Sequence, residues 1–382
     1  MTHLMAQRAS TTILSYRRAA DVAAFHSGVS LHSHTHHSRE TVSELKTQIA
    51  RVPVLAAMFE RELQGRLRST THAVDLSRSA WRPPVSPRDV FASEAGQIES
   101  RLELEPIVSV TDHDTIAAGL DLQEYYVPSR APVSVEWTVP FGPTYFHLGI
   151  HNLPAARASE WWQRLEAYTS QPAERALAER LAELDEMPDV LVVFNHPMWD
   201  LADVGVGTHH AWVRRFLEVH RHRLHAVEIN GYRRQAENDQ SWTLASAQDL
   251  PVVSGGDRHG LEPNAMLNVS TARTMSDFVA EIRRGLSTIV VMPEYRRHIW
   301  GRTLASAADV LSRRRAPFGG WQYWTDRVHC EADGRSYPLS DHWPGGGPWR
   351  VRSFVAAFRL LTRPPLLNVL CGVLTLADRS RA

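Results

Sequence analysis

Short apolar runs rich in β-branched residues recur along this chain and alternate with longer segments of helical spacing. Such runs predict buried strands, whereas apolar residues that repeat every three to four positions predict amphipathic helices. The predicted strands are residues 28–34, 106–114, 131–138, 144–153, 189–197, 226–230 and 251–259, and the predicted helices are residues 40–67, 88–102, 160–187 and 275–286. Because strands and helices alternate, the pattern favours an α/β fold with a mostly parallel sheet.

The number of strands indicates how the sheet is arranged. About seven strand–helix units are too many for a small open sheet and suit a barrel related to the TIM type. We therefore predict a (β/α)7 TIM-like barrel with a C-terminal extension. The predicted domains are an N-terminal segment 1–24, a barrel over 25–300 and an extension over 301–382 that is partly irregular and then helical. The stretch 68–87 contains Ser, Thr and Pro and is predicted to be a loop insertion.

Histidines and carboxylates stand on the predicted strands or where these strands end. The chain has 20 histidines, and this group comprises His32, His34, His113, His147, His196 and His259, together with Glu136, Glu228 and Asp257. Buried strands avoid such side chains unless these are paired or bind metal. Residues i and i+2 face the same side of a strand, so His32 and His34 can bind one ion. Because active sites of barrel enzymes collect at the carboxyl ends of strands, the pattern predicts a site with several metal ions.

The order of these motifs resembles that of the PHP (polymerase and histidinol phosphatase) family over residues 25–290. The matching elements are, in order, Leu31-His32-Ser33-His34-Thr35, the TDHDT sequence of residues 111–115, Glu136 with His147, His196-Pro197, the VEIN sequence of residues 227–230, and Asp257-Arg258-His259. Each element alone is a weak signal, but all of them occur in the family's order on strand-like runs. The resemblance also implies the distorted seven-stranded barrel.

The resemblance implies a set of metal ligands. It assigns His32, His34 and Asp257 to a first ion, Glu136 to a bridge, His147 and His196 to a second ion, and His113 and His259 to a third. The family's motif places an aspartate of the third site after the serine, but here Ser38 is followed by Arg39. Glu40, His36 or His37 are the available substitutes. We therefore expect two or three divalent ions, and histidines with carboxylates suit Zn, Mn or Fe.

The activity that the resemblance implies is metal-dependent hydrolysis of phosphoester bonds in a small phosphate ester or nucleotide. Two ions share a hydroxide, which attacks phosphorus in line. The residues expected to act in catalysis are Asp257, Glu136, His259 and Arg258. For Arg258, contact with phosphate and a structural salt bridge are equally open.

Several neighbouring residues admit more than one interpretation. Glu228 is either a partner that orients a ligating histidine or a member of a structural pair. His147 is preferred to His151 as a ligand because of its HLG context. Trp137 and Trp199 closely follow motif residues and are candidates for the lining of the pocket.

Charge narrows the classes of function. Positive and negative side chains cancel, 42 against 42, so no stable nucleic-acid binding is expected. A nuclease that acts on short or single-stranded nucleic acid stays an alternative. Two further alternative functions are open. One is a metal-dependent amide hydrolase, which would use nearly the same ligands, and the other is a non-catalytic, metal-stabilised binding module. The sequence does not indicate which oligomeric state the protein adopts.

The numbers of lysines and cysteines argue against further classes of functional site. The only lysine, Lys46, lies in helix-like sequence without a glycine loop, which argues against a Walker-type phosphate loop. Cys330 and Cys371 are too few for a Cys-type zinc finger and fit a reducing compartment. The N-terminus lacks the apolar core of a signal peptide and no apolar run reaches about 18 residues, so we predict a cytoplasmic protein without a membrane span. The apolar segment 364–377 is predicted to be a helix docked on the barrel, with a membrane-surface or dimer helix as the alternative.

Overall fold

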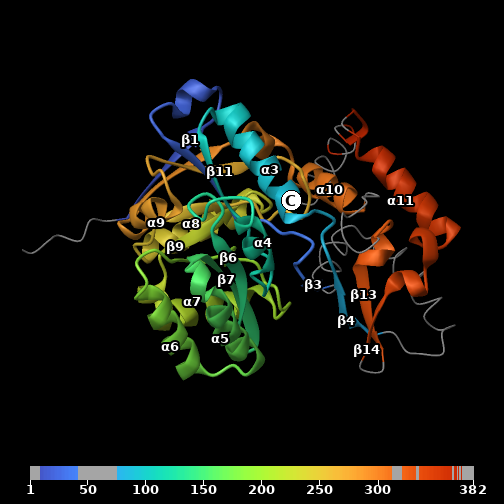
Figure 1. The fold of residues 1–382 in the computed structure, drawn as a ribbon, viewed down its shortest axis with the longest axis horizontal. Coiled ribbons are helices and arrows are strands. Elements are labelled where there is room, and N and C mark those ends of the chain that lie inside the picture. Colours follow the sequence, from blue (N-terminus) through green and yellow to red (C-terminus); the bar gives the residue numbers. More distant parts are fainter. Residues whose placement is uncertain are drawn as a thin grey trace, which may run out of the picture. The chain divides into compact units, whose positions relative to one another are not determined.

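The computed structural model describes residues 9–41, 75–311, 321–332, 335–363, 365–367, 369 and 371 (Figure 1). The chain divides into two compact units. The first unit consists of Met1–His34 and Pro87–Ile299, and the second unit consists of Thr35–Ser86 and Trp300–Ala382. The domain boundaries expected at residues 25 and 300 stay predictions.

All seven predicted strands are present in the first unit. They are β2 (Ser27–Leu31), β5 (Glu105–Ser109), β6 (Val133–Phe141), β7 (Thr144–Leu153), β8 (Leu191–Phe194), β9 (Ala226–Asn230) and β10 (Val252–Gly255). The sequence pattern missed three others, β1 (Ser10–Ser15), β11 (Met266–Ser270) and β12 (Leu286–Val291). Every residue of β2, β8, β9 and β10 is buried, which explains why their sequences are largely continuous apolar runs.

These strands form two separate five-stranded sheets, in the orders β1-β12-β11-β2-β5 and β10-β9-β8-β7-β6. In the first sheet, β1 is parallel to β12 and β2 is parallel to β5, whereas β11 is antiparallel to both of its neighbours. In the second sheet, β8, β9 and β10 are parallel, and β7 is antiparallel to both β6 and β8. Neither sheet closes on itself. The predicted (β/α)7 TIM-like barrel is therefore wrong, and the fold is mixed α/β.

Local geometry explains this difference. Only Gly142 and Pro143 separate β6 from β7, which leaves no room for a crossover helix, so these strands form an antiparallel hairpin. Gly142 adopts a positive φ of 63° in that turn, a conformation that glycine favours. Isolated bridges join Ser33 to Arg258 and His113 to Glu136 across the strand ends, instead of continuous ladders.

The predicted helices of the first unit are confirmed with shifted bounds. They correspond to α3 (Pro87–Gln97) with the π-helical turn η2 (Ile98–Leu102), α5 (Ala158–Ser170), α6 (Glu174–Asp185) and α9 (Met275–Arg283). The unit also contains α4 (Ala117–Gln123), α7 (Val206–His220) and α8 (Gln235–Ala247). Thr274 caps α9, because its side chain accepts a hydrogen bond from the Asp277 backbone N–H.

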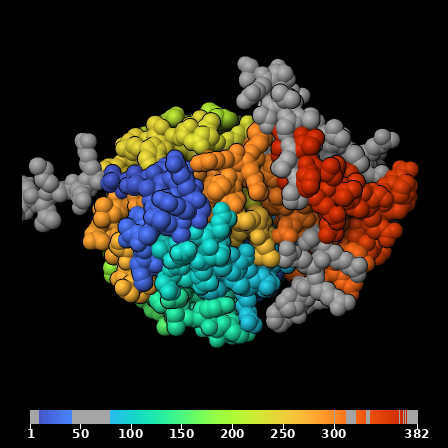
Figure 2. Space-filling model, turned by 90° about the horizontal axis from the view of Figure 1, so that it is seen from above, coloured from blue at the N-terminus to red at the C-terminus, as the bar shows by residue number. Residues whose placement is uncertain are grey.

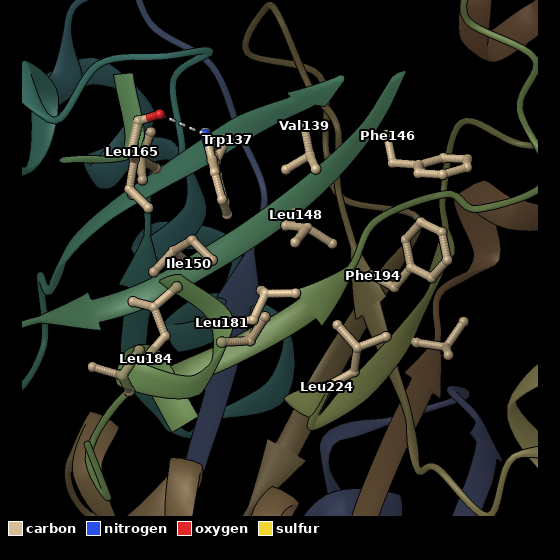
Figure 3. Close-up of a cluster of buried hydrophobic side chains, with 14 of the residues drawn as sticks. Trp137, Val139, Phe146, Leu148, Ile150, Leu165, Leu181, Leu184, Phe194 and Leu224 are labelled. Atoms are coloured by element: carbon tan, nitrogen blue, oxygen red, sulfur yellow. Dashed lines mark hydrogen bonds between the residues drawn. The ribbon is translucent and has the colours of Figure 1, made fainter. Parts of the chain in front are cut away.

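A large apolar core lies between the second sheet and the helices that cover it (Figure 3). Trp137 on β6 is completely buried, and its ring N–H donates to the Leu165 carbonyl oxygen at 3.2 Å. Trp137 is thus a core residue and does not line a pocket. In the same core Phe146 packs edge-on against Phe194 and Phe216, and these two rings are tilted against each other, with ring separations of 5.1–5.3 Å. This core makes the sheet a rigid support for the side chains at its strand ends.

The second unit contains an antiparallel sheet in the order β14-β13-β4-β3. Its strands are β3 (Glu40–Thr41), β4 (Asp75–Trp81), β13 (Val328–Ala332) and β14 (Arg335–Pro338), and its helices are α10 (Ile299–Val310) and α11 (Trp349–Leu361). β4 lies inside the stretch 68–87 and pairs with β13, so the expected loop is wrong for these residues.

Two other expectations fall mostly outside the described residues. The helix predicted over residues 40–67 begins instead with strand β3, and the rest of that range is not described. Most of segment 364–377 is likewise outside the described residues. Among the described helices, none has the length and apolarity needed to cross a membrane.

Candidate metal centre

Left-handed backbone conformations mark the ends of three strands in the first unit. His32 after β2, His196 after β8 and Asp257 after β10 have φ values of 68°, 25° and 48°. Residues other than glycine rarely adopt such values, and they persist only where surrounding contacts enforce them. Here the Asp257 backbone N–H donates to the His32 carbonyl oxygen at 2.6 Å, and the His34 N–H donates to the Arg258 carbonyl oxygen at 2.8 Å. These contacts hold the segments that follow β2 and β10 side by side.

Glu136 on β6 lies at the centre of the histidine group and is completely buried. Its Oε2 is 2.9 Å from His32 Nε2, 3.4 Å from His34 Nε2 and 3.2 Å from His113 Nδ1. Its Oε1 is 3.3 Å from His147 Nδ1 and 3.1 Å from His196 Nε2. The two oxygens of one carboxylate therefore face two different sets of imidazoles.

These separations fit ligands around metal ions. Two atoms that are each about 2.1 Å from a tetrahedral ion lie about 3.4 Å apart. The separations between Glu136 and the imidazoles of His34, His113, His147 and His196 fall between 3.1 and 3.4 Å. Three buried groups hold donor atoms within 4.8 Å of one another, namely His32–His34–Glu136, His113–Glu136–His147 and His32–His196–Glu228. The donor set thus fits more than one divalent ion.

Glu228 on β9 contacts the group differently. Its Oε1 is only 2.6 Å from His32 Nδ1, which is a hydrogen-bond distance, and its Oε2 accepts from the His196 backbone N–H at 2.8 Å. A histidine that ligates through Nε2 needs a partner at Nδ1 to fix its ring. Of the two interpretations of Glu228, the structure favours the residue that orients His32.

Asp257 joins the group through one oxygen and is held through the other. Its Oδ1 is 3.4 Å from His34 Nε2 and 3.7 Å from His32 Nε2, and its Oδ2 accepts from the Arg233 guanidinium at 2.7 Å. Arg233 is buried and stacks over Trp199 at 3.4 Å, while Trp199 lies edge-on to His196. Trp199 is therefore close to the centre. The sequence analysis missed Arg233, although its position three residues after the end of β9 was an available signal.

His259 and His113 flank His34. The His34 ring stacks on His259 at 4.4 Å and on His113 at 4.6 Å between centroids. His113 Nδ1 also lies 3.2 Å from Glu136 Oε2, so His113 contacts both His34 and the central carboxylate. The residues expected to replace the missing third-site aspartate, Glu40, His36 and His37, belong to the second unit, and their role stays a prediction.

Arg258 pairs with a carboxylate that is not part of this group of donors. It is completely buried, and its guanidinium forms an ion pair with Glu94 of α3 at 2.5 Å. Of the two roles considered for Arg258, this contact favours the structural salt bridge. His151 likewise has another partner, because its Nδ1 lies 2.8 Å from the Ser109 hydroxyl and burial lowers its pKa to about 3. That placement supports the choice of His147 over His151.

The electrostatics of the centre favour a cation. Burial would raise the pKa of Glu136, but the positive charges of His32 and His113 outweigh it and hold that pKa well below its usual range. Burial would lower the pKa of His32, but Glu136 and Glu228 together raise it well above its usual value. At His196 burial dominates and lowers the pKa, which favours the neutral imidazole that binds metal. A proton on His32 thus occupies a position where a metal ion can replace it.

Comparisons with known proteins give no close relative. No family model matches the sequence, and no curated protein matches it. The chain is similar in structure to PsfC from Pseudomonas syringae PB-5123, with a TM-score of 0.36 and 14% identity over 55% of this chain and 84% of that chain.

Two other solved structures are similar at the same level. One is an amidohydrolase from Chromobacterium violaceum with bound sulfate and no metal, with a TM-score of 0.31 and 14% identity over 46% of this chain and 83% of that chain. The other is named a putative metal-dependent phosphoesterase from Bifidobacterium adolescentis ATCC 15703, with a TM-score of 0.30 and 17% identity over 52% of this chain and 91% of that chain. Likenesses of this strength assign neither a family nor an activity to this chain.

Proposed function

We propose that this chain is a metal-dependent hydrolase that cleaves phosphoester bonds in a small phosphate ester or nucleotide. The observation that carries the proposal is the placement of Glu136, whose two carboxylate oxygens face separate sets of imidazoles. A buried carboxylate in that position suits a bridge between two cations, and it is costly to bury without them.

The donor geometry suggests which residues would hold each ion. The proposed first set is His32 Nε2, His34 Nε2, Asp257 Oδ1 and Glu136 Oε2. The proposed second set is Glu136 Oε1, His147 Nδ1 and His196 Nε2. His113 and His259 remain the candidates for a third site. Imidazoles mixed with carboxylates suit Zn, Mn or Fe.

The protein's own residues would prepare the reaction in three ways. Divalent ions bound here supply Lewis acidity and a water of lowered pKa for attack on phosphorus. Glu136 and Asp257 stay ionised because neighbouring imidazoles and Arg233 hold their pKa values well below the usual range. Glu228 fixes the ring of His32, and Arg233 holds Asp257 in place. We leave Arg258 out of substrate binding because its guanidinium is paired with Glu94.

The test is hydrolysis by protein that was purified without chelator and supplied with Mn²⁺ or Zn²⁺. We expect turnover of p-nitrophenyl phosphate or of a nucleotide monophosphate, and a loss of at least about a hundredfold in Glu136→Gln. The control is Glu281→Gln, which removes a carboxylate that contacts Ser270 and Thr271 instead of the histidines. A parallel panel of amide substrates tests the alternative chemistry. Turnover of amides alone, or no turnover of any substrate by metal-loaded protein, would contradict the proposal.

A further inference from the structure

Helix α11 of the second unit carries exposed apolar side chains along one line of its surface. Trp349 and Leu360 are 66% and 51% exposed. They are 11 positions apart, close to three turns of an α-helix, and the exposed Ala356 lies between them on the same line. The opposite side of α11 carries Phe358, which is buried and packs in a small apolar cluster with Leu304 of α10. The helix therefore has one packed face and an opposite face on which Trp349, Ala356 and Leu360 are exposed; this part of the chain is red in Figure 2.

Exposed arginines flank this line on both sides. With a rotation of about 100° per residue, Arg352 and Arg359 lie on one side of Trp349 and Leu360, and Arg350 lies on the other. The sequence from Trp349 to Cys371 contains four arginines and no acidic residue. The whole chain is neutral, so this positive charge is a local feature. An anionic partner would match it.

We propose that this face, formed by Trp349, Ala356 and Leu360 with Arg350, Arg352 and Arg359, docks on the surface of an anionic phospholipid bilayer. Tryptophan and leucine insert at the boundary between headgroups and acyl chains, whereas arginine side chains extend from the apolar line to the phosphates. A nucleic acid would match the arginines but would leave Leu360 without an apolar environment. A purely apolar partner would leave the exposed charges of Arg352 and Arg359 unmatched.

Two further observations fit attachment at the surface of a bilayer. Leu366 and Val369 are also exposed, at 43% and 67%, so the apolar surface continues past the end of the helix. α11 has 13 residues, whereas a span needs about 20, so the helix would lie in the plane of the interface. This inference is independent of the proposed hydrolase activity.

The experiment is co-flotation of the full chain with vesicles of phosphatidylcholine alone or with added phosphatidylglycerol. We expect binding to the mixed vesicles only, and weaker binding as the salt concentration rises. The double variant Arg352→Glu/Arg359→Glu tests the charge, and Trp349→Ser/Leu360→Ser tests the apolar line. Each double variant should weaken binding by at least about tenfold. The matched controls are Arg175→Glu on α6 and Val206→Ser on α7, which change exposed residues of the first unit and should leave binding unchanged.

Three outcomes would overturn the proposal. One is an absence of binding to mixed vesicles by the unaltered chain. Another is that Arg352→Glu/Arg359→Glu abolishes binding to the vesicles whereas Trp349→Ser/Leu360→Ser leaves it intact. The surface would then recognise negative charge alone. The third is a concentration-dependent dimer in size-exclusion chromatography that Leu360→Ser disrupts, without flotation, because the face would then be covered by a second copy. Phosphatase activity on a soluble substrate should be the same in both double variants, which separates this test from that of the active site.

Discussion

Glu136 shows how one residue can organise the proposed centre. Its burial would be unfavourable for a charged group, yet five histidines lie within 3.4 Å of its two oxygens. The sequence pointed to Glu136 because a glutamate in the run VSVEWT is out of place on a buried strand. It could not show that each oxygen faces its own set of imidazoles, because that depends on strands far apart in the sequence.

Glu228 leads to a prediction about metal affinity. Glu228→Gln removes the carboxylate that orients His32, so we expect metal affinity about 10 to 100 times weaker, as for other partners of ligating histidines. The measurement is competition with a chromophoric chelator, with folding checked by circular dichroism. Unchanged affinity in a folded variant would place Glu228 in a structural pair instead.

His220 on α7 predicts a pH dependence of stability. It packs against Phe141 and Phe216, and burial lowers its pKa to about 4 from an ordinary value near 6.5. Between these values the unfolded chain binds a proton that the folded chain does not, so this residue makes stability fall as pH drops from 6.5 to 4. One histidine contributes at most about 1.4 kcal/mol per pH unit to this slope.

The measurement for His220 is urea denaturation at several pH values, compared with the variant His220→Phe. The variant should lose less stability than the unaltered chain over this window, and above pH 7 the difference in stability between the two should no longer change with pH. If the two chains show parallel pH dependence, His220 is not desolvated as the structure describes.

At the scale of elements, the apolar pattern predicted the positions of seven strands correctly, but the parallel pairing inferred from it was partly wrong. All seven predicted strands exist because most residues of each run are buried, and in β2, β8, β9 and β10 every residue is. The pattern missed β1, β11 and β12, and it took β6 and β7 for members of a parallel series. The five-residue gap between the two predicted runs, residues 139–143, was the overlooked signal, because a parallel pair needs a crossover of a dozen residues or more.

The pair Arg258–Glu94 connects two elements, the segment after β10 and helix α3, and it predicts a stability effect. Glu94→Ala leaves a buried guanidinium without its partner, so unfolding should become easier by about 3–5 kcal/mol. Replacing both residues, as in Arg258→Met/Glu94→Leu, should recover much of that loss. Chemical denaturation of the single and double variants measures both effects.

The same double variant also tests the role of Arg258 in function. If Arg258 is structural, the double variant should keep its KM for phosphate esters once it is folded. A KM that rises by tenfold or more in the stable double variant would return Arg258 to the substrate-binding residues. In that case the ion pair with Glu94 would not represent the working enzyme.

At the scale of the whole molecule, the order of motifs along the chain predicted which side chains come together better than it predicted the architecture. The residues predicted as ligands from six segments converge in the first unit, because strand ends and left-handed turns bring them together. Arg233 lies three residues after the end of β9, at a position that the order of motifs did not include. The second unit was not foreseen either, since its sheet joins residues near 40 and 80 to residues near 330. Cytoplasmic localisation and a small phosphorylated substrate stay predictions.

The most direct test of the central claim is the number of metal ions per chain. Elemental analysis of protein purified without chelator should find two or three Zn, Mn or Fe ions per chain, and Glu136→Gln should lose at least one of them while Glu281→Gln keeps them all. Fewer than one ion per chain after incubation with added metal, or an unchanged number in folded Glu136→Gln, would contradict the claim that Glu136 bridges a multi-metal centre.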